Sequence, residues 1–446
     1  MTGTDDLSRT LARFAADLSF ASAPGPARHA AVRMTLNVVA LATAAARRPS
    51  VELTLDRHRR LGTPARWSLF GREERAGSFV APLVNAMAAH VDDYDDTHLP
   101  TVVHPGAPIV PAALVAAEHA GASGAETMSG ILAGVEVGLR VADGVCPEHL
   151  VRGWHPTGTG GHIGAAVAAG RVLGLDPEQM QAALALGVAQ AAGLLTVNGT
   201  MTKAFHPAKA AADGFEAALL AQQGMTGPDT PIESPFGFAR ATSPKVDLDR
   251  MVDDLGTRWE IEKNAIKPYA CGIVSHAAID AARTLRDHVA PDEIESIEAR
   301  VPQIVLDAMG IEDPQDALET KFSVYHCIAV GLLDGAGGPP QFSDERAIAP
   351  DVREVRQRVR TVVDPEVPKA AVHLTVTTTD GRELVEEVIH ATASAEKPMT
   401  DEQLQTKARG LLEPVLGAER ATEVIQHAEG LPDADGVAEL FAATQW

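Results

Sequence analysis

A dense group of ionisable side chains marks residues 92–104. Four of these residues are aspartates, and two, His98 and His104, are histidines. Neighbouring carboxylates repel one another, and partial burial would move their pKa values apart, which supplies both an acid and a base near neutral pH. A solvated acidic loop is the ordinary alternative, because charge runs are usually exposed. The nearly apolar segments on either side, 79–91 and 109–117, favour a buried site.

His155 and Thr157 belong to a second candidate segment, which is rich in glycine. Histidines beside glycine or proline in short irregular stretches are stronger functional candidates than histidines inside helices. Gly158–Gly161 precedes a predicted helix, whose first backbone N–H groups can bind a carboxylate, and a tight packing turn explains these residues equally well. The segment lacks the spacing of a dinucleotide-binding loop and has no P-loop lysine.

Two basic segments offer positive charge to an anionic substrate. Lys203 lies just before a helix predicted over residues 210–223, where its charge adds to that of the helix N-terminus. Lys267 and His276 lie at a predicted domain junction, and Asp280, four residues after His276, is expected to orient its imidazole. For any single lysine, an exposed surface position is the ordinary alternative.

The composition excludes several classes of protein. With 446 residues, 45% hydrophobic but only 4% aromatic, the chain is expected to pack helices closely through Ala, Leu and Val. The formal net charge of −22 argues against nucleic-acid binding but permits a local basic pocket for a small anionic substrate. Cys146, Cys271 and Cys327 form no CxxC pair. With no evident signal peptide and no apolar run of ~18 residues, we expect a cytoplasmic protein that does not enter a membrane.

Helical patterns dominate most of the chain. They cover residues 80–224, with breaks such as the N-cap pair Asp176-Pro177, and they return from Thr400 onwards. Residues 294–302 alternate like a half-buried strand, and Asp380-Gly381 predicts a hairpin. The expected fold is mostly α, with a large all-helical domain, a smaller α+β lid domain and a site in the cleft between them. The expected boundaries are 1–266 with 393–446 for the helical domain, and 267–392 for the lid.

Several of these motifs occur together in an order that resembles a known family. The chain is similar to the MmgE/PrpD family over residues 7–430, almost its whole length. The likeness rests on residues 93–97, His104–Gly106 with Pro111-Ala112, His155–Thr159, Lys203 with His206, Lys267–Tyr269 with His276, and Leu332–Gly335. The family's activities include dehydration of 2-methylcitrate, decarboxylation of cis-aconitate and epimerisation of iminodisuccinate. The resemblance implies a helical domain with an α+β lid, a homodimer, and no metal or organic cofactor.

The resemblance also implies a set of site residues. The catalytic set is Asp93, Thr97, His104, Lys203 and His276. Substrate-binding residues are expected at His155, Thr157, Lys267, Tyr325 and His326. At the position of a family tyrosine in the lid helix, this chain has His326, with Tyr325 one place earlier, and the turn between Thr97 and His104 is one residue longer than in the decarboxylases.

Reactions of this kind make or break a bond at a carbon next to a carboxylate. They need a base near that carbon, and cations or hydrogen-bond donors for the charge that develops. Lys203 would neutralise the carboxylate, while His104 or His276 would move the proton, because an imidazole titrates near the working pH. The roles of acid and base stay open between these two histidines.

Four functions are compatible with this pattern. The first is a cofactor-independent lyase for a small di- or tricarboxylate, by dehydration or decarboxylation, and the second is an epimerase or isomerase with the same base and anion pocket. A third is a metal-dependent hydrolase with ligands among the mixed carboxylates and imidazoles. The fourth is a non-catalytic helical assembly protein that keeps the fold. The candidate metal ligands are Asp93, Asp95, His98 and His104.

The four aspartates are expected to differ in role. Asp93 would hold a histidine in one tautomer and, with Thr97, face the substrate. Asp92, Asp95 and Asp96 are expected to be structural, as caps, as partners of basic side chains, or as supports of the turn before His104.

Overall fold

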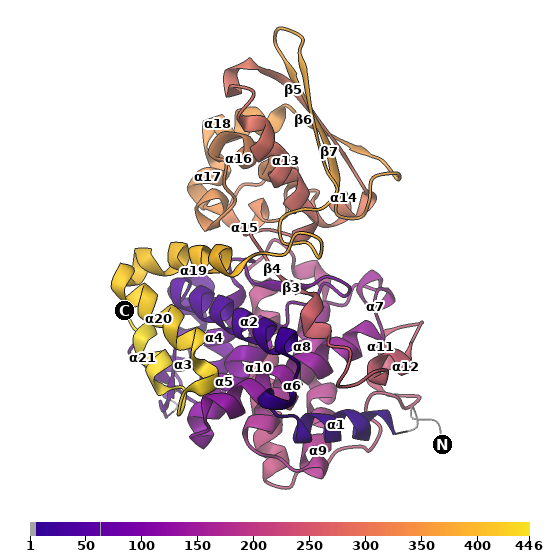
Figure 1. Ribbon diagram of the computed structural model, residues 1–446, viewed down its shortest axis with the longest axis vertical. Helices are drawn as coiled ribbons and strands as arrows, with labels where there is room; N and C mark the ends of the chain where they lie inside the picture. Colours follow the sequence, from indigo (N-terminus) through magenta and orange to yellow (C-terminus); the bar gives the residue numbers. More distant parts are fainter. Residues whose placement is uncertain (1–5, 63) are drawn as a thin grey trace.

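The computed structural model describes residues 6–62 and 64–446, which form two lobes (Figure 1). The larger lobe is helical, and the smaller lobe, at the top of the view, carries a four-stranded sheet with helices beside it. The predicted class, mostly α with a smaller α+β part, is confirmed.

The larger lobe contains the N-terminal two-thirds of the chain and the C-terminal helices. Its elements are α1 (Leu7–Asp17), α2 (Gly25–Ala44), α3 (Pro49–Arg59), β1 (Trp67–Ser68), β2 (Arg75–Ala76), α4 (Val80–His90), β3 (Asp96–His98), α5 (Gly106–Ala120), α6 (Gly124–Asp143), α7 (Glu148–Val151), α8 (Pro156–Val172), α9 (Pro177–Gln190), α10 (Thr202–Gln222), α11 (Phe238–Thr242), α12 (Leu248–Val252), β4 (Asn264–Ile266), α19 (Asp401–Leu416), α20 (Ala418–Glu429) and α21 (Ala438–Thr444). Helix α19 packs against α2, so the chain returns to this lobe after leaving the smaller one.

Close helix packing builds the core of the larger lobe. Helix α8 lies against α5, α6, α9 and α10, and small residues at the crossings allow the backbones to approach. A Cβ at Gly134 of α6 would lie 2.4 Å from the carbonyl oxygen of Gly164 in α8. A Cβ at Gly214 of α10 would lie 2.5 Å from the Cβ of Ala165. The small residues that replace aromatic side chains in this core therefore allow the helices to pack closely, as expected.

Two local predictions in this lobe are wrong in detail. Helix α8 already begins at Pro156, so Gly158–Gly161 lie inside its first turns and not in a preceding loop. A Cβ at Gly158 would lie 2.4 Å from the carbonyl oxygen of Ala192, which shows that this glycine serves packing. Helix α10 begins at Thr202 and continues through Pro207, which places Lys203 within the helix.

The smaller lobe is built on one mixed sheet. The strand order is β6-β5-β7-β8, with β5 parallel to β6 and antiparallel to β7. The predicted hairpin at Asp380-Gly381 is confirmed, since β7 and β8 pair as antiparallel neighbours around it. The elements are α13 (His276–Arg286), β5 (Ile294–Val301), α14 (Gln303–Met309), α15 (Ala317–Thr320), α16 (Val324–Asp334), α17 (Asp344–Ile348), α18 (Pro350–Gln357), β6 (Val359–Val363), β7 (Val372–Thr378) and β8 (Glu383–Val388).

A short ribbon lies where the lobes meet. Strand β3 pairs antiparallel with β4, so that Asp96 lies opposite Ile266 and His98 opposite Asn264 (Figure 1). This pairing joins the acidic segment to the chain just before it enters the smaller lobe. Strands β3 and β4 were not predicted, and they fix the position of the residues between α4 and α5.

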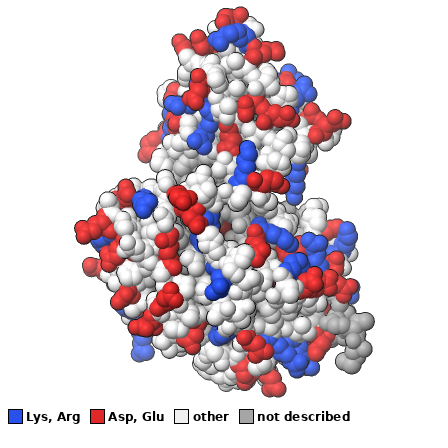
Figure 2. Space-filling model, in the orientation of Figure 1, with Lys and Arg blue, Asp and Glu red and all other residues white. Residues whose placement is uncertain are grey.

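The surface is acidic on both lobes. On the face that Figure 2 shows, Asp and Glu side chains are spread over the two lobes with Lys and Arg between them. Within residues 6–62 and 64–446, no single helix has the length and apolar character to cross a membrane, and only the bent pair α2 and α3 passes that test together.

Candidate active site

Asp93 lies at the centre of a buried group of charges. It follows α4 and precedes β3, and its backbone φ of 51° is in the left-handed region. Aspartate is one of the few non-glycine residues that adopts this region readily, and such conformations cluster at functional sites. Only 3% of Asp93 is exposed.

Two lysines bind the same oxygen of this carboxylate. Oδ1 of Asp93 accepts hydrogen bonds from Nζ of Lys203 at 2.6 Å and from Nζ of Lys267 at 2.8 Å. Burial alone would raise the pKa of Asp93, but the two ammonium groups lower it well below its usual range. Burial lowers the pKa of Lys203 in spite of Asp93, whereas Asp93 and Asp95 outweigh burial at Lys267 and raise its pKa. The three side chains form a buried ion cluster with a surplus of positive charge.

Asp92 and Asp96 have the structural roles expected of them. Asp92 forms an ion pair with Arg48, at 3.0 Å. Both carboxylate oxygens of Asp96 accept from the backbone N–H of Gly106, at 3.1 and 3.2 Å, which ties the acidic segment to the start of α5. Asn264 of β4 donates to the same carboxylate at 2.6 Å. Burial and the neighbouring Asp95 raise the pKa of Asp96 to about 7.

Asp95 supports His90, a histidine that sequence reasoning passed over. Nδ1 of His90 donates to Oδ2 of Asp95 at 2.7 Å, and both side chains are buried. Burial would raise the pKa of Asp95, but the charges of His90 and Lys267 lower it. Among the described residues, neither Nε2 of His90 nor Oδ1 of Asp95 has a hydrogen-bond partner. Unpartnered buried polar atoms are rare and call for a ligand or a water molecule.

His104 is held in one orientation by groups that accept hydrogen bonds. Its Nδ1 lies 2.7 Å from the backbone oxygen of Asp96 and 3.1 Å from Oγ1 of Thr97. A carbonyl oxygen can only accept, so Nδ1 of His104 carries the proton, and Nε2 has a free lone pair. Thr157 of α8 fixes the backbone, because its Oγ1 accepts from the N–H of His104 at 3.0 Å. Burial, with the charge of Lys267, lowers the pKa of His104 to about 3.

His155 and His206 form a pair of imidazoles beside this cluster. His155 precedes α8, its backbone N–H donates to Gly193, and its Nδ1 lies 2.9 Å from Nδ1 of His206 on α10. Burial and the charge of Lys203 lower the pKa of His155 well below its usual range. Burial also lowers the pKa of His206, to about 4.

A small cavity lies against His90, Asp93 and Lys203, at the boundary between the lobes. Its larger-lobe wall includes His90, Asp93, Met201 and Lys203, and its smaller-lobe wall comprises Leu318, Lys321 and Phe322. The free space is only about 20 Å³, which is room for about one water molecule. A carboxylate substrate would therefore enter only if the smaller lobe or the segment around Met201 moves outward.

Two further buried lysines surround the acidic segment and were not predicted. Lys321 donates to the backbone oxygen of Asp92 at 2.8 Å, and Lys407 of α19 donates to that of Tyr94 at 2.6 Å. Burial lowers the pKa of both lysines. Lys321 reaches the cavity from the lid, whereas Lys407 stacks on Tyr94, 3.7 Å from the ring centre. No local sequence signal distinguishes Lys407 from a surface lysine.

Three of the expected site residues make their contacts inside the smaller lobe. His276 begins α13, and its Nε2 donates to the backbone oxygen of Cys271 at 3.4 Å. Tyr325 shares a hydrogen bond with Thr361 at 2.9 Å. His326 donates through Nε2 to the backbone oxygen of Gln341 at 2.8 Å. None of these three forms a hydrogen bond to Asp93, His104 or Lys203.

The expectation that Asp280 orients His276 is wrong. Instead, Asp280 accepts from the hydroxyl of Tyr269 and from the backbone N–H of Thr392. Asp280 and His276 share one helix face, but this does not bring their side chains into contact. Asp280 instead links the two segments that enter and leave the smaller lobe.

The predicted set of four metal ligands does not come together. Both ring nitrogens of His98 have partners outside the predicted ligand set. Its Nδ1 contacts Thr101 at 2.8 Å, and its Nε2 contacts Glu260 at 3.1 Å. A different group, His90, Asp93 and Asp95, offers ligand atoms within 4.8 Å of one another. Two ammonium groups already occupy Oδ1 of Asp93, and their charge opposes a divalent cation at that place.

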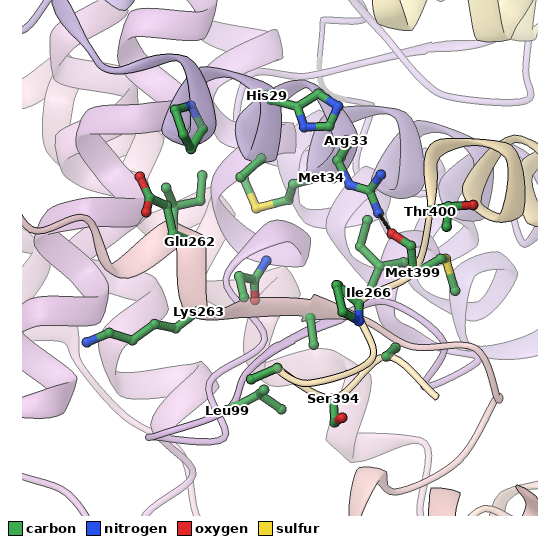
Figure 3. Close-up of a pocket in the computed structure, with 18 of the residues that line it drawn as sticks. His29, Arg33, Met34, Leu99, Glu262, Lys263, Ile266, Ser394, Met399 and Thr400 are labelled. Atoms are coloured by element: carbon green, nitrogen blue, oxygen red, sulfur yellow. Dashed lines mark hydrogen bonds between the residues drawn. The ribbon is translucent and has the colours of Figure 1, made fainter. Parts of the chain in front are cut away.

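A larger cavity, of about 880 Å³, lies elsewhere along the same ribbon. Figure 3 shows His29, Arg33 and Met34 of α2 on one side, β4 with Ile266 across it, and Ser394 and Met399 of the returning chain at its edge. Arg33 pairs with Asp401, and none of the lining residues belongs to the buried ion cluster. We therefore place the chemistry at the small cavity, where unpartnered polar atoms and shifted pKa values coincide.

A helical lobe, a smaller α+β lobe and a buried group of Lys, His and Asp side chains where they meet are the features of an enzyme with a candidate acid–base site between two lobes. The chain belongs to the MmgE/PrpD family: the model of the MmgE/PrpD N-terminal domain matches residues 9–251, and that of the C-terminal domain matches residues 269–431.

Characterised relatives carry decarboxylase names. Cis-aconitate decarboxylase of Mus musculus is 27% identical over 82% of this chain and 78% of its own. The Homo sapiens enzyme of the same name is 27% identical over 79% of this chain and 76% of its own. The Aspergillus terreus enzyme is 24% identical over 93% of this chain and 91% of its own.

Proposed function

We propose that the protein is a lyase that acts on a small di- or tricarboxylate by proton transfer at a carbon next to a carboxylate, without a metal or an organic cofactor. The observation that carries the proposal is the double ion pair of Asp93 with Lys203 and Lys267. Asp93 and Lys203 line the small cavity between the lobes, and the imidazoles of His104 and His155 lie near Lys203. The relatives named cis-aconitate decarboxylase support a lyase acting on a carboxylate.

The lysines provide the anion site. Lys203 and Lys321 both line the cavity, and Asp93 neutralises only part of the charge that Lys203 and Lys267 bring. In a small buried cavity, an ammonium group attracts a carboxylate far more strongly than in bulk solvent. These lysines would also stabilise the negative charge that develops on the substrate as a proton leaves the adjacent carbon.

We propose His104 as the base of this reaction. Its Nδ1–H is directed at Asp96, so Nε2 carries the lone pair that can accept a proton. In the empty site, burial and the nearby lysines lower the pKa of this imidazole and keep it neutral. A bound carboxylate offsets their charge and raises the proton affinity of His104, so the base gains strength when the substrate is present. Thr97 and Thr157 hold His104 in place for this step.

We propose His155 as the second proton-transfer group. Burial and the charge of Lys203 lower its pKa. Its Nδ1 contacts His206, and among the described residues its Nε2 makes no hydrogen bond. An acid and a base on two imidazoles serve dehydration, decarboxylation and epimerisation alike, because each reaction removes or adds a proton next to a carboxylate.

Proton NMR with a panel of carboxylic acids tests this function. The protein is incubated with 2-methylcitrate, citrate and cis-aconitate in deuterated buffer with excess chelator, and substrate loss, product formation and deuterium uptake are followed. We expect one member of the panel to react. Complete loss of turnover on addition of chelator would overturn the cofactor-independent mechanism, and no reaction with any member would favour the non-catalytic alternative.

We also propose that the enzyme is a cytoplasmic homodimer. The connection between α9 and α10 exposes Leu194 and Met201, and the first turn of α10 exposes Phe205, with 50%, 46% and 42% of each residue accessible to solvent. A second copy would cover such an apolar surface. The three unpaired cysteines fit a reducing compartment. Light scattering after size-exclusion chromatography tests the assembly, and a mass of about one chain would contradict it.

A further inference from the structure

The imidazoles of His155 and His206 approach each other through the same ring atom. Their Nδ1 atoms are 2.9 Å apart, and their ring centres are 5.1 Å apart. His155 is buried, whereas His206, one turn after Lys203 on α10, is only partly buried. The pair therefore runs from the buried interior, near Lys203, toward the surface of the larger lobe.

A hydrogen bond between two Nδ1 atoms constrains both rings. One nitrogen must donate and the other must accept, so the neutral pair holds one proton between its Nδ1 atoms. If His206 donates, His155 carries its own proton on Nε2 and can act as an acid. If His206 accepts, Nε2 of His155 has a lone pair and can act as a base. The state of His206 thus decides which role His155 can take.

The surroundings keep this pair neutral when the site is empty. Burial is the main cause at His155, and His90 of α4, His104, Lys203 and His206 also disfavour a positive charge on it. Burial is again the main cause at His206, where His90, His162 of α8 and Lys203 act with the same sign. The carboxylate of Asp213 is bound to His162 and Lys209 and does not offset these charges at His206.

We propose that His206 is a positioning residue that sets the tautomer of His155 and conducts protons between His155 and the solvent. This role rests on the proposed function, because it assigns a task to His155 in that reaction. The proposed reaction does not itself require a second histidine next to His155. The contact between His206 and His155 therefore adds proton exchange with the solvent, which the lysines and His104 do not provide.

The proton movement balances without any further reagent. Nε2 of His155 gives its proton to the substrate, Nδ1 of His155 takes the proton from Nδ1 of His206, and Nε2 of His206 takes one from water. Both imidazoles end neutral, each in the opposite tautomer, and the solvent has lost one proton to the substrate. The reverse sequence removes a proton from the substrate and returns the pair to its first state.

Two substitutions separate positioning from conduction. His206→Asn keeps an amide that can donate to or accept from Nδ1 of His155, but it cannot pass a proton on. His206→Leu removes both properties. We expect His206→Asn to keep KM within about threefold while kcat falls at least tenfold, and His206→Leu to change both. Exogenous imidazole should restore kcat of His206→Asn in proportion to its concentration, since the position is partly open to solvent. His288→Asn, at an exposed histidine of the smaller lobe, is the matched control.

Nitrogen NMR of the protein labelled with 15N-histidine gives a readout that does not depend on turnover. His206→Leu should change the Nδ1 and Nε2 shifts of His155, because the tautomer is no longer fixed, whereas His206→Asn should keep one tautomer. Wild-type kcat and pH profile in both variants would overturn the proposal, and so would a loss of kcat in His206→Asn that imidazole does not restore. If the wild-type protein turns over no carboxylate while the shifts respond as expected, the proposed function fails and the pairing stands.

Discussion

His104 donates its Nδ1 proton to the backbone oxygen of Asp96 across 2.7 Å, and this one bond determines which nitrogen of the imidazole can act as a base. The acceptor is a carbonyl of β3, which is itself paired with β4 at the lobe boundary. The ribbon between the lobes therefore fixes the tautomer of His104 as well as its position. Sequence patterns alone leave the roles of acid and base open, and this contact is the reason why we propose His104 as the base.

The variant His104→Asn should lose activity while keeping its fold. The asparagine amide can still donate to Asp96, as Nδ1–H does, but it has no basic nitrogen in the place of Nε2. Loss of a general base typically costs 10²–10⁴-fold in rate, so we expect kcat to fall by about that factor. The thermal midpoint should change little. Steady-state kinetics and a melting curve test this, and a variant that retains more than a third of the wild-type kcat would show that another group is the base.

Replacing Asp93 by Asn should destabilise the fold. The change leaves the ammonium groups of Lys203 and Lys267 buried together without their shared carboxylate. Removing one partner of a buried ion cluster costs about 3–5 kcal/mol. The backbone is not the cause, because Asn tolerates the left-handed conformation as well as Asp does. Urea unfolding measures the loss.

The double variant Asp93→Asn with Lys203→Met is the control for that experiment. It removes one of the two unpaired charges, so it should be more stable than Asp93→Asn alone. Additive losses in the two single variants would show that the charges do not interact, contrary to the cluster described above.

Asp96 should make stability depend on pH in an unusual direction. Burial and Asp95 raise its pKa from 3.8 to about 7 in the folded state. Between pH 4 and 7 the folded chain therefore holds a proton that the unfolded chain has released, and the contribution of Asp96 to stability falls as pH rises through this window. Asp96→Asn, which cannot ionise, should lose less stability relative to wild type at pH 7 than at pH 5. Unfolding free energies at the two pH values test this, and a difference that stays constant or grows with pH would contradict it.

Glycine at the crossing of α6 and α8 should be required for close packing. A Cβ at Gly164 would lie 2.5 Å from Cδ1 of Ile109 and 2.8 Å from the backbone oxygen of Gly134. Overpacking of this kind typically costs 1–3 kcal/mol, so Gly164→Ala should lower the thermal midpoint. The same substitution at Gly410 of α19, where a Cβ meets nothing within 4 Å, should be neutral or stabilise by up to about 1 kcal/mol. Equal effects at the two positions would show that packing is not the cause.

The parts of the fold that local chemistry specifies could be predicted from the sequence. Asp176 accepts from the backbone N–H groups of Glu178 and Gln179, and α9 begins at Pro177 as expected of an N-cap followed by proline. The hairpin at Asp380-Gly381 follows from turn residues between two alternating runs. The start of α10 was placed too late because Pro207 lies inside that helix.

Contacts between distant segments could not be predicted in the same way. Asn264 and Asp96 are separated by 168 residues, and Lys407 and Tyr94 by 313. No local sequence pattern therefore predicts either contact. His90 lies at the end of an apolar helix, so its sequence context indicates a residue of the hydrophobic core and not a site residue. The candidate residues around Asp93 could be predicted because so many aspartates and histidines rarely occur in one short segment. The partners that orient them lie far away in the sequence and are brought close only by folding.

The central claim is that the ion cluster beneath the lid binds and activates a carboxylate, and a comparison of two lysines on α10 tests it most directly. Lys203 and Lys209 each pair with an aspartate, but only Lys203 lines the cavity. With the substrate found in the NMR panel, kcat/KM is measured for Lys203→Gln and Lys209→Gln. We predict a loss of about 10²–10³-fold for Lys203→Gln, as expected when a group that stabilises developing charge is removed, and a change within about threefold for Lys209→Gln. Near wild-type kcat/KM in Lys203→Gln, with its fold intact, would contradict the account.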